Sequence, residues 1–194
     1  GGETGLKTSL AAHFQAQGRM LFKACGVRSQ EVLEALSVGE TPWQPDFIGI
    51  NFSSVSKRRW DPMATDSTFM PSDRAVAVFY QNSEAEVRAV LEKCSFKTVQ
   101  LYADEVSPAF VRSLKQRVIL AARVSETTDF SALEPYASDV DFFILDGTVP
   151  GSFAQDGPRV ADRGLPALPY EPAVYGPETG CGGIKSSWVS AIHC

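Results

Sequence analysis

The chain has 194 residues, a formal net charge of −5 and 44% hydrophobic residues. This length suits a single domain, and the acidic balance excludes a strongly basic surface for nucleic acid. No stretch is long and apolar enough to predict a transmembrane helix, and the first residues lack the charged-then-apolar pattern of a signal peptide.

The cysteine pattern excludes the usual zinc sites. No CxxC pair occurs and only two histidines are present, so we expect no metal centre and a reducing, intracellular compartment. The cytoplasm, a mitochondrion and a plastid are not distinguished by these features. The four cysteines are Cys25, Cys94, Cys181 and Cys194.

Residues 1–20 form a predicted N-terminal helical extension. Leu6, Leu10 and Phe14 recur at helical spacing, which predicts one amphipathic helix. Packing on the main body is one role for this helix, and a partner contact or the end of a cleaved targeting sequence are alternatives. We expect residues 21–194 to form the second unit, a single α/β body.

From residue 21 onward, strand and helix patterns alternate. The predicted strands cover residues 21–27, 46–52, 74–80, 97–102, 118–124 and 140–147. The predicted helices cover residues 29–39, 82–94, 107–117 and 125–137, with only a weak helical pattern at 61–73. The strands are nearly continuous apolar runs, which is typical of a parallel sheet covered on both faces.

This alternation predicts an α/β fold with right-handed crossovers. A doubly wound sheet and a (β/α)8 barrel both satisfy it. Past Asp146 the pattern weakens, because residues 147–180 are rich in glycine and proline.

Polar residues at the predicted strand ends are the candidates for chemistry, because ligands bind at the carboxyl ends of the strands in both folds. A cysteine and an aspartate there can act as a base that takes a proton and an acid that gives one. The alternatives are a buried, inert Cys25 and a turn-forming Asp146. The strand-end residues are Cys25, Asn51, Tyr102, Asp104, Arg123 and Asp146.

Two further segments could bind anions. In "SVSKRRW", Arg58 or Arg59 could hold a carboxylate with two hydrogen bonds, although such a loop can equally be only solvated. In "CGGI", Gly182 and Gly183 precede a helix-like segment, whose backbone N–H groups could bind phosphate.

Taken in order, these pieces resemble the phosphoribosylanthranilate isomerase family. "FKACGV" is similar to the family's first-strand "KICGI", and "DFIGINFSSVSKRRW" to its second strand and "SKR" loop. "AVAVFYQN" is similar to "VGVFVN", "VQLYADE" to "VQLHGDE", and "FFILDG" to "LLLD". The resemblance extends to "ETGCGGIKSSWVSAI" and covers about residues 21–193.

The resemblance implies an Amadori rearrangement of phosphoribosylanthranilate that needs no metal or organic cofactor. By this resemblance Cys25 is the general base and Asp146 the general acid. Arg58 would contact the carboxylate of the substrate, and Gln100 matches the family's fourth-strand glutamine. The phosphate would lie on Gly182 and Gly183.

The same resemblance implies a TIM (β/α)8-type barrel that is incomplete. We find no match for the family's eighth strand and helix, and the segment "YGPETGC" makes a poor seventh strand. The segment "GSFAQDG", residues 151–157, replaces a glycine-rich loop that helps enclose the substrate. We expect open sheet edges that the N-terminal helix or a protein partner covers.

These departures lead to two hypotheses about function. We interpret the chain as a degenerate isomerase-like protein, a pseudoenzyme that serves as a structural or interaction subunit of a larger assembly. The alternative is an active phosphoribosylanthranilate isomerase of tryptophan biosynthesis, acting on a phosphorylated small molecule. Retention of Cys25, Asp146 and Arg58 favours the alternative.

Overall fold

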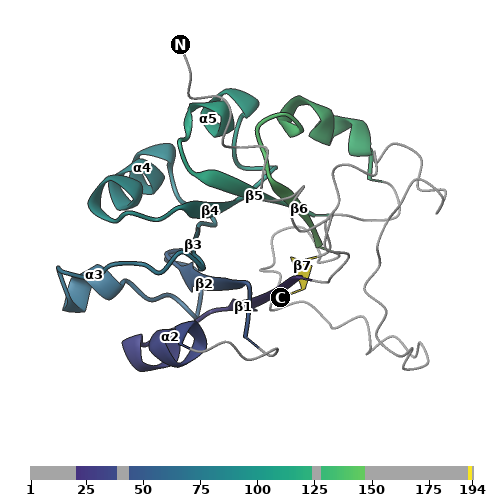
Figure 1. The fold of residues 1–194 in the computed structure, drawn as a ribbon. Helices are drawn as coiled ribbons and strands as arrows, with labels where there is room; N and C mark the ends of the chain where they lie inside the picture. Colours follow the sequence, from purple (N-terminus) through teal and green to yellow (C-terminus); the bar gives the residue numbers. More distant parts are fainter. Residues whose placement is uncertain (1–20, 39–43, 124–127, 147–191, 194) are drawn as a thin grey trace, which may run out of the picture.

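The computed structural model describes residues 21–38, 44–123, 128–146 and 192–193 (Figure 1). The strands are β1 (Leu21–Cys25), β2 (Phe47–Asn51), β3 (Ala75–Val78), β4 (Thr98–Tyr102), β5 (Arg117–Arg123), β6 (Phe142–Asp146) and β7 (Ile192–His193). The helices are α2 (Gln30–Ser37), α3 (Pro62–Thr65), α4 (Glu84–Lys93), α5 (Pro108–Ser113) and the 3-10 helix η1 (Phe130–Tyr136).

The strands form one parallel sheet of seven strands in the order β6-β5-β4-β3-β2-β1-β7. From β1 to β6, each strand pairs with the next one along the chain, so this part of the sheet has no point at which the strand order reverses. A doubly wound sheet requires such a point, and this alternative is therefore wrong. The sheet curves with helices α2 to α5 on its convex side (Figure 1), which gives a TIM-barrel-like half-barrel.

An aromatic contact across the concave side shows how strongly the sheet curves. The rings of Phe47 on β2 and Phe142 on β6 meet edge to face, with centroids 5.7 Å apart. These strands are separated by three others in the sheet, and neighbouring strands lie about 4.8 Å apart. A flat sheet would hold the two rings far apart, so the interior of the half-barrel is filled by side chains from opposite strands.

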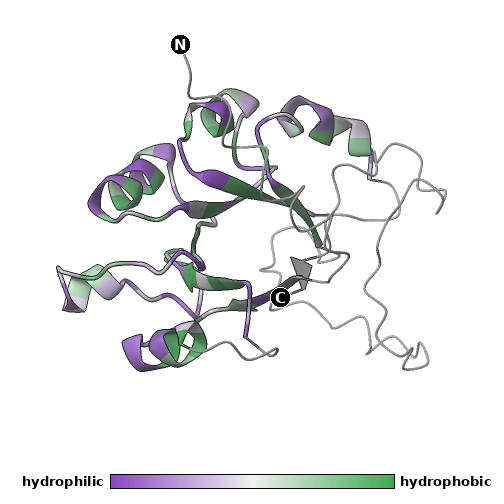
Figure 2. Cartoon of the chain, in the orientation of Figure 1, coloured by the Kyte–Doolittle hydropathy of each residue, from purple (hydrophilic) through white to green (hydrophobic). Residues whose placement is uncertain are grey.

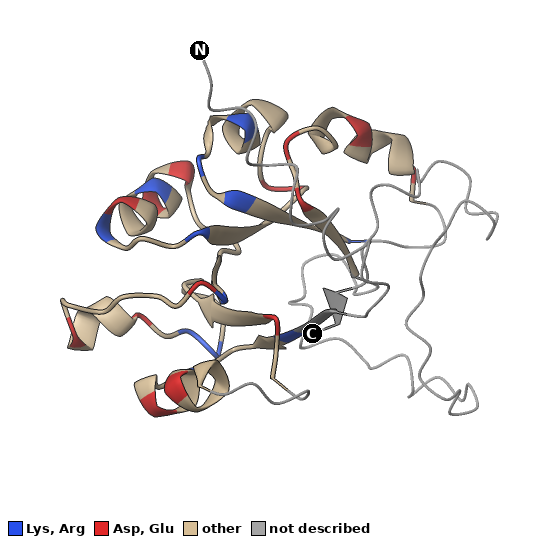
Figure 3. Ribbon diagram, in the orientation of Figure 1, with Lys and Arg blue, Asp and Glu red and all other residues tan. Residues whose placement is uncertain are grey.

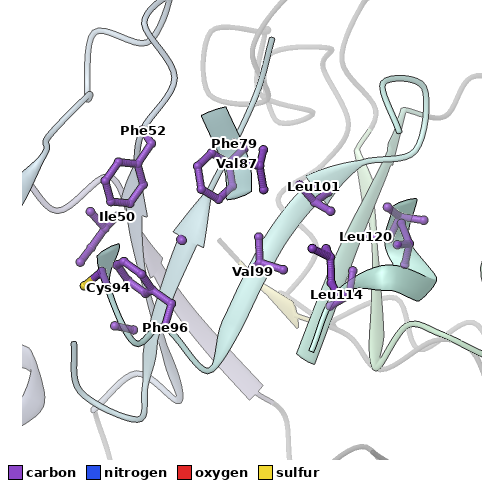
Figure 4. Packing of buried hydrophobic residues seen from close by; sticks show 14 of the residues in the cluster. Ile50, Phe52, Phe79, Val87, Cys94, Phe96, Val99, Leu101, Leu114 and Leu120 are labelled. Atoms are coloured by element: carbon purple, nitrogen blue, oxygen red, sulfur yellow. The ribbon is translucent and has the colours of Figure 1, made fainter. Parts of the chain in front are cut away.

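The larger hydrophobic core lies between the sheet and the helices. Ile50, Val99 and Leu120 from three strands, and Phe79 directly after β3, pack there with Val87 of α4 (Figure 4). Along β4, Val99 and Leu101 belong to this core, so the alternating residues Thr98, Gln100 and Tyr102 face the concave side. Figure 2 shows the resulting hydrophobic strands and the mixed character of the helices.

The helices begin where the sequence supplies hydrogen-bond acceptors for their first N–H groups. Ser29, Asp61, Ser83 and Ser107 each accept a hydrogen bond from a backbone N–H group of the following helix. In α4 the pair Ser83 and Glu86 forms a capping box. These caps set where each helix begins after its strand.

One predicted helix differs in the structure. The helix expected at 125–137 is the 3-10 helix η1, which contains Pro135. Proline lacks an N–H donor and disfavours helical geometry in the residue before it, so a regular α-helix is not stable there. The weak pattern at 61–73 gives only the single turn of α3.

Strand β7 corrects the expectation for the end of the chain. We expected the residues near 192 to begin a helix and the open sheet edge to be covered by the N-terminal helix or a protein partner. Instead, Leu21 of β1 lies in register with Ile192, and Phe22 with His193, in a parallel pair. Pairing supplies partners for backbone groups of β1 that an open edge leaves exposed. The predicted N-terminal extension at 1–20 and the segment at 151–157 lie outside the described residues.

Charged residues mark the surface of the half-barrel. Figure 3 shows most of them on the helices and on the connections between strands, while the strands carry few. Within the described part of the chain, no helix has the length and apolar character that crossing a membrane requires.

Candidate active site at the carboxyl ends of the strands

The parallel sheet brings the predicted strand-end residues to one rim. Cys25, Asn51, Tyr102, Arg123 and Asp146 are each the last residue of their strand. Register links their strands: Cys25 pairs with Gly49, Tyr102 with Ala121, and Arg123 with Asp146. Because the strands are parallel, the backbones of these residues lie at the same edge of the sheet.

Cys25 has a cationic neighbour on its own strand. The Nζ atom of Lys23 donates a hydrogen bond to the Sγ atom of Cys25 over 3.1 Å. Lys23 is only 3% exposed, whereas Cys25 is partly exposed at the end of β1. An ammonium group beside a cysteine favours the thiolate, which is the form that can take a proton.

Gly49 makes room for this pair. A Cβ atom at position 49 would lie 3.0 Å from the sulfur of Cys25 and 3.1 Å from Nζ of Lys23. Any side chain there would press on both groups. The glycine on β2 therefore belongs to the geometry that holds the thiol and the ammonium together.

Two buried polar residues, on β2 and β4, each have an atom without a hydrogen-bond partner among the described residues. The Oδ1 atom of Asn51 accepts a hydrogen bond from the backbone N–H of Ser53 over 2.9 Å, but its Nδ2 atom has no partner among the described residues. The Oε1 atom of Gln100, on the concave face of β4, likewise has none within the described ranges. Both residues are at least 96% buried, and unpaired buried groups of this kind are uncommon in folded proteins.

Arg123 lies at the end of β5 against two tyrosine rings. Its Cζ atom is 4.7 Å from the ring centroid of Tyr80 and 4.8 Å from that of Tyr102. The two rings touch each other with centroids 5.0 Å apart. The Nη1 atom of Arg123 also pairs with the carboxylate of Asp104.

The carboxyl group of Glu105, which follows β4, binds the tight turn after β3. The backbone N–H of Gln81, a residue with φ of 55°, donates to both carboxyl oxygens of Glu105 over 3.0 and 3.1 Å. Burial raises the pKa of Glu105, and the charge of Asp104 adds to this, while the Gln81 hydrogen bond and Arg123 act in the opposite direction. Glu105 thus stays protonated to a higher pH than an exposed glutamate.

The basic loop after β2 approaches the end of β1. Gly26 has φ of 80°, and a Cβ atom there would lie 2.5 Å from Cδ of Arg58. Arg58 is exposed, and the backbone of Arg59 forms a bridge with Asn51. The structure therefore places the stem of Arg58 directly over the turn that follows Cys25.

The structure describes only some of the other predicted site residues. Asp146 ends β6, on the strand next to Arg123, while Gly182 and Gly183 lie outside the described residues. The described residues contain no cluster of His, Cys, Asp and Glu that could hold a metal ion. The roles of Cys25 and Asp146 in catalysis, and of the other residues in binding, stay predictions.

Sequence reasoning missed Lys23 and Tyr80. Lys23 is two residues before Cys25, so strand alternation alone places both on one face. The same argument places Tyr80, two residues after Val78, above the concave face of β3. This signal was present in the sequence, but a lysine inside a strand is an unusual core residue.

Comparison with known proteins identifies the relatives of this chain. The family model described as N-(5'phosphoribosyl)anthranilate (PRA) isomerase matches residues 22–157. The N-(5'-phosphoribosyl)anthranilate isomerase of Moorella thermoacetica is 30% identical over 139 residues, which is 70% of this chain and 59% of the relative. That of Pelobacter propionicus is 30% identical over 140 residues, 70% of this chain and 63% of the relative.

A solved structure agrees with the sheet described above. The phosphoribosyl anthranilate isomerase of Thermococcus kodakaraensis superposes with a TM-score of 0.53 at 25% identity, covering 69% of this chain and 67% of that one. The chain spans less than two thirds of the length of the two curated relatives above.

These matches correct the first of our two hypotheses about function. The interpretation of the chain as a non-catalytic structural or interaction subunit is wrong, because the matched relatives are named as isomerases and nothing points to a pseudoenzyme. That interpretation depended on the predicted N-terminal helix, on the altered loop at 151–157 and on where the sequence stops, and the last of these carries no information about activity. The alternative, an isomerase, agrees better with the relatives.

Proposed function

Because the chain belongs to the N-(5'-phosphoribosyl)anthranilate isomerase family, we propose that it takes part in the Amadori rearrangement of phosphoribosylanthranilate. This reaction converts an aminoaldose into an aminoketose and belongs to tryptophan biosynthesis. The proposed substrate is a phosphorylated small molecule. The match over residues 22–157 carries the proposal, because it includes the strands that bear Cys25 and Asp146.

The proposed chemistry needs one base and one acid. An acid protonates the ring oxygen of the aminoaldose, so that the ring opens to a protonated imine. A base then removes the proton from C2, which gives a neutral enolamine. The enolamine becomes the ketose when C1 gains a proton and the C2 hydroxyl loses its proton. We assign the base to the Cys25 thiolate and the acid to Asp146.

The geometry supports this assignment for Cys25. The Lys23 ammonium, 3.1 Å from the sulfur, favours the thiolate. Cys25 is partly exposed at the rim, whereas Cys94 is buried at the C-terminal end of α4, where burial raises the pKa of its thiol. Of the two cysteines in the described ranges, Cys25 is thus the one suited to act as a base.

Further assignments belong to the same proposal. The carboxylate of the substrate would meet Arg58, and the phosphate would meet Gly182 and Gly183. An incomplete barrel, an N-terminal unit at residues 1–20 and a protein partner along the sheet edge stay predictions without a test.

The test is the loss of phosphoribosylanthranilate fluorescence with the purified chain at high concentration. We expect turnover by the wild-type chain, and a fall of at least about a hundredfold in Cys25→Ala and Asp146→Asn, the typical contribution of a general acid or base.

Two matched variants serve as controls. Cys94→Ala removes a thiol far from the rim. Asp73→Asn removes a carboxylate that is 78% exposed and pairs with Lys97. Asp73 precedes β3 and therefore lies at the opposite end of the strands from the rim. Both should retain activity. Equal turnover rates of Cys25→Ala and the wild type would contradict the assignment of Cys25 as the base.

A further inference from the structure

The guanidinium of Arg123 is held in one orientation by its surroundings. One contact is the shelf formed by the rings of Tyr80 and Tyr102, over which its Cζ atom lies at 4.7 and 4.8 Å. The other is Asp104, which binds Nη1. The side chain is only 9% exposed, so its plane and its rotation are both determined by neighbouring groups.

One edge of this guanidinium has no hydrogen-bond partner among the described residues. The atoms Nε and Nη2 are buried and make no hydrogen bond there. They lie on the same edge of the planar group, and their N–H bonds point in parallel. This is the arrangement that binds two oxygens of a carboxylate or a phosphate at once.

We propose that the Nε and Nη2 edge of Arg123 is a binding site for a small oxyanion, a carboxylate or a phosphate. Asp104 occupies Nη1 and leaves this edge as the available pair of donors. Burial strengthens a charge-assisted hydrogen bond, because the local dielectric constant is lower than that of water. The site would lie at the rim that carries Cys25, at the end of β5.

The neighbouring side chains restrict the direction from which an anion can reach the Nε and Nη2 edge. The two tyrosine rings hold the guanidinium plane, so the anion must approach in that plane. Both nitrogens are shielded from solvent, so an anion reaches them by displacing the atoms that cover them. The inference concerns binding at equilibrium and does not depend on turnover.

The test is calorimetric titration of the full chain with inorganic phosphate and, separately, with 2-aminobenzoate. Aniline, which has the same ring without the carboxylate, is the ligand control. We expect one of the two oxyanions to bind, and Arg123→Met to weaken it at least about tenfold. Arg123→Lys keeps the charge but loses the paired donors, and it should weaken binding to a similar extent.

Arg112→Met is the matched protein control, since Arg112 is an exposed arginine on α5 that pairs with Asp139. It should bind the anion as the wild type does. Binding of phosphate or of 2-aminobenzoate identifies the source of the oxyanion. If Arg123→Met does not fold, the Arg123→Lys result decides.

Two outcomes overturn the inference. One is that neither oxyanion binds the wild type at millimolar concentration. The other is that binding in Arg123→Lys equals that of the wild type. Wild-type binding without isomerase turnover would overturn the proposed function alone, whereas turnover without Arg123-dependent binding would overturn this inference alone.

Discussion

At the scale of single residues, the pair of Lys23 and Cys25 makes the sharpest prediction. The ammonium lies 3.1 Å from the sulfur, so Lys23→Met should lower the thiolate fraction of Cys25. We expect alkylation of Cys25 by iodoacetamide at pH 7 to slow by about tenfold, because a charge at this distance shifts ionisation strongly.

The measurement is mass spectrometry of the Cys25 peptide at timed intervals, over a series of pH values. Cys94 in the same samples is the internal control, because it is buried and should react slowly in both proteins. An unchanged rate and pH profile for Cys25 in Lys23→Met would show that the hydrogen bond does not favour the thiolate.

Gly26 carries a second prediction at this scale. Its φ of 80° is left-handed, and a Cβ atom would meet Cδ of Arg58 at 2.5 Å. Gly26→Ala should lower the free energy of unfolding by about 1–2 kcal/mol, measured by urea denaturation. Gly26→Asn should cost less, because asparagine tolerates left-handed backbone better. Equal stability of Gly26→Ala and the wild type would contradict the backbone described here.

The sequence allowed most of the strand-end residues to be predicted, because parallel strands bring their carboxyl ends to one rim. Cys25 and Arg123 were found in this way. Lys23 was missed because buried lysines are rare. The Nε and Nη2 edge of Arg123, which has no hydrogen-bond partner within the described residues, could not be predicted either, because its position depends on contacts with Tyr80 and Tyr102 that sequence spacing does not contain.

At the scale of elements, α4 offers a prediction about pH. Hydrogen bonds from Ser83, the backbone N–H first, hold the pKa of Glu86 below its ordinary value of 4.5. A lowered pKa stabilises the fold above the unfolded-state pKa, and this stabilisation is lost as the pH falls through the folded-state pKa. Glu86→Gln should therefore lose more stability at pH 7 than at pH 3.

Urea unfolding at the two pH values checks this result. Glu84→Gln is the matched control, because Glu84 shares the first turn but not the capping box. Ser83→Ala should cost about 1 kcal/mol at pH 7 through the lost cap. A loss in Glu86→Gln that is the same at both pH values would exclude an ionised capping box.

Elements near proline and at the sheet edge were the hardest to predict. The apolar spacing at 125–137 favoured an α-helix, but Pro135 limits the segment to the 3-10 turns of η1. Strand β7 is only two residues long, and its pairing with β1 is a contact between distant parts of the chain. Local periodicity cannot reveal a pairing of this kind.

At the scale of the whole molecule, the contact of Phe47 with Phe142 tests the curvature of the sheet. The single and double replacements by leucine form a cycle, with each free energy of unfolding measured in urea. We expect a coupling energy of about 0.5–1.5 kcal/mol, as is typical of aromatic pairs. A coupling near zero would mean that β2 and β6 do not face each other across the interior.

Phe96 supplies the control for this cycle. It packs in the outer core against Phe52 and Phe69, so the pair of Phe47 and Phe96 should show independent effects. The barrel-like curvature was one of two folds that the alternating pattern allowed. The resemblance of the motifs favoured it, and the order of the strands then excluded the doubly wound sheet.

The central claim is that the rim bearing Cys25 isomerises phosphoribosylanthranilate. The most direct single measurement is growth, without tryptophan, of a host that lacks its own isomerase and expresses this chain at matched levels as wild type, Cys94→Ala or Cys25→Ala. We predict growth with the first two and none with Cys25→Ala. Equal growth with Cys25→Ala, or no growth with folded wild-type chain, would contradict the account.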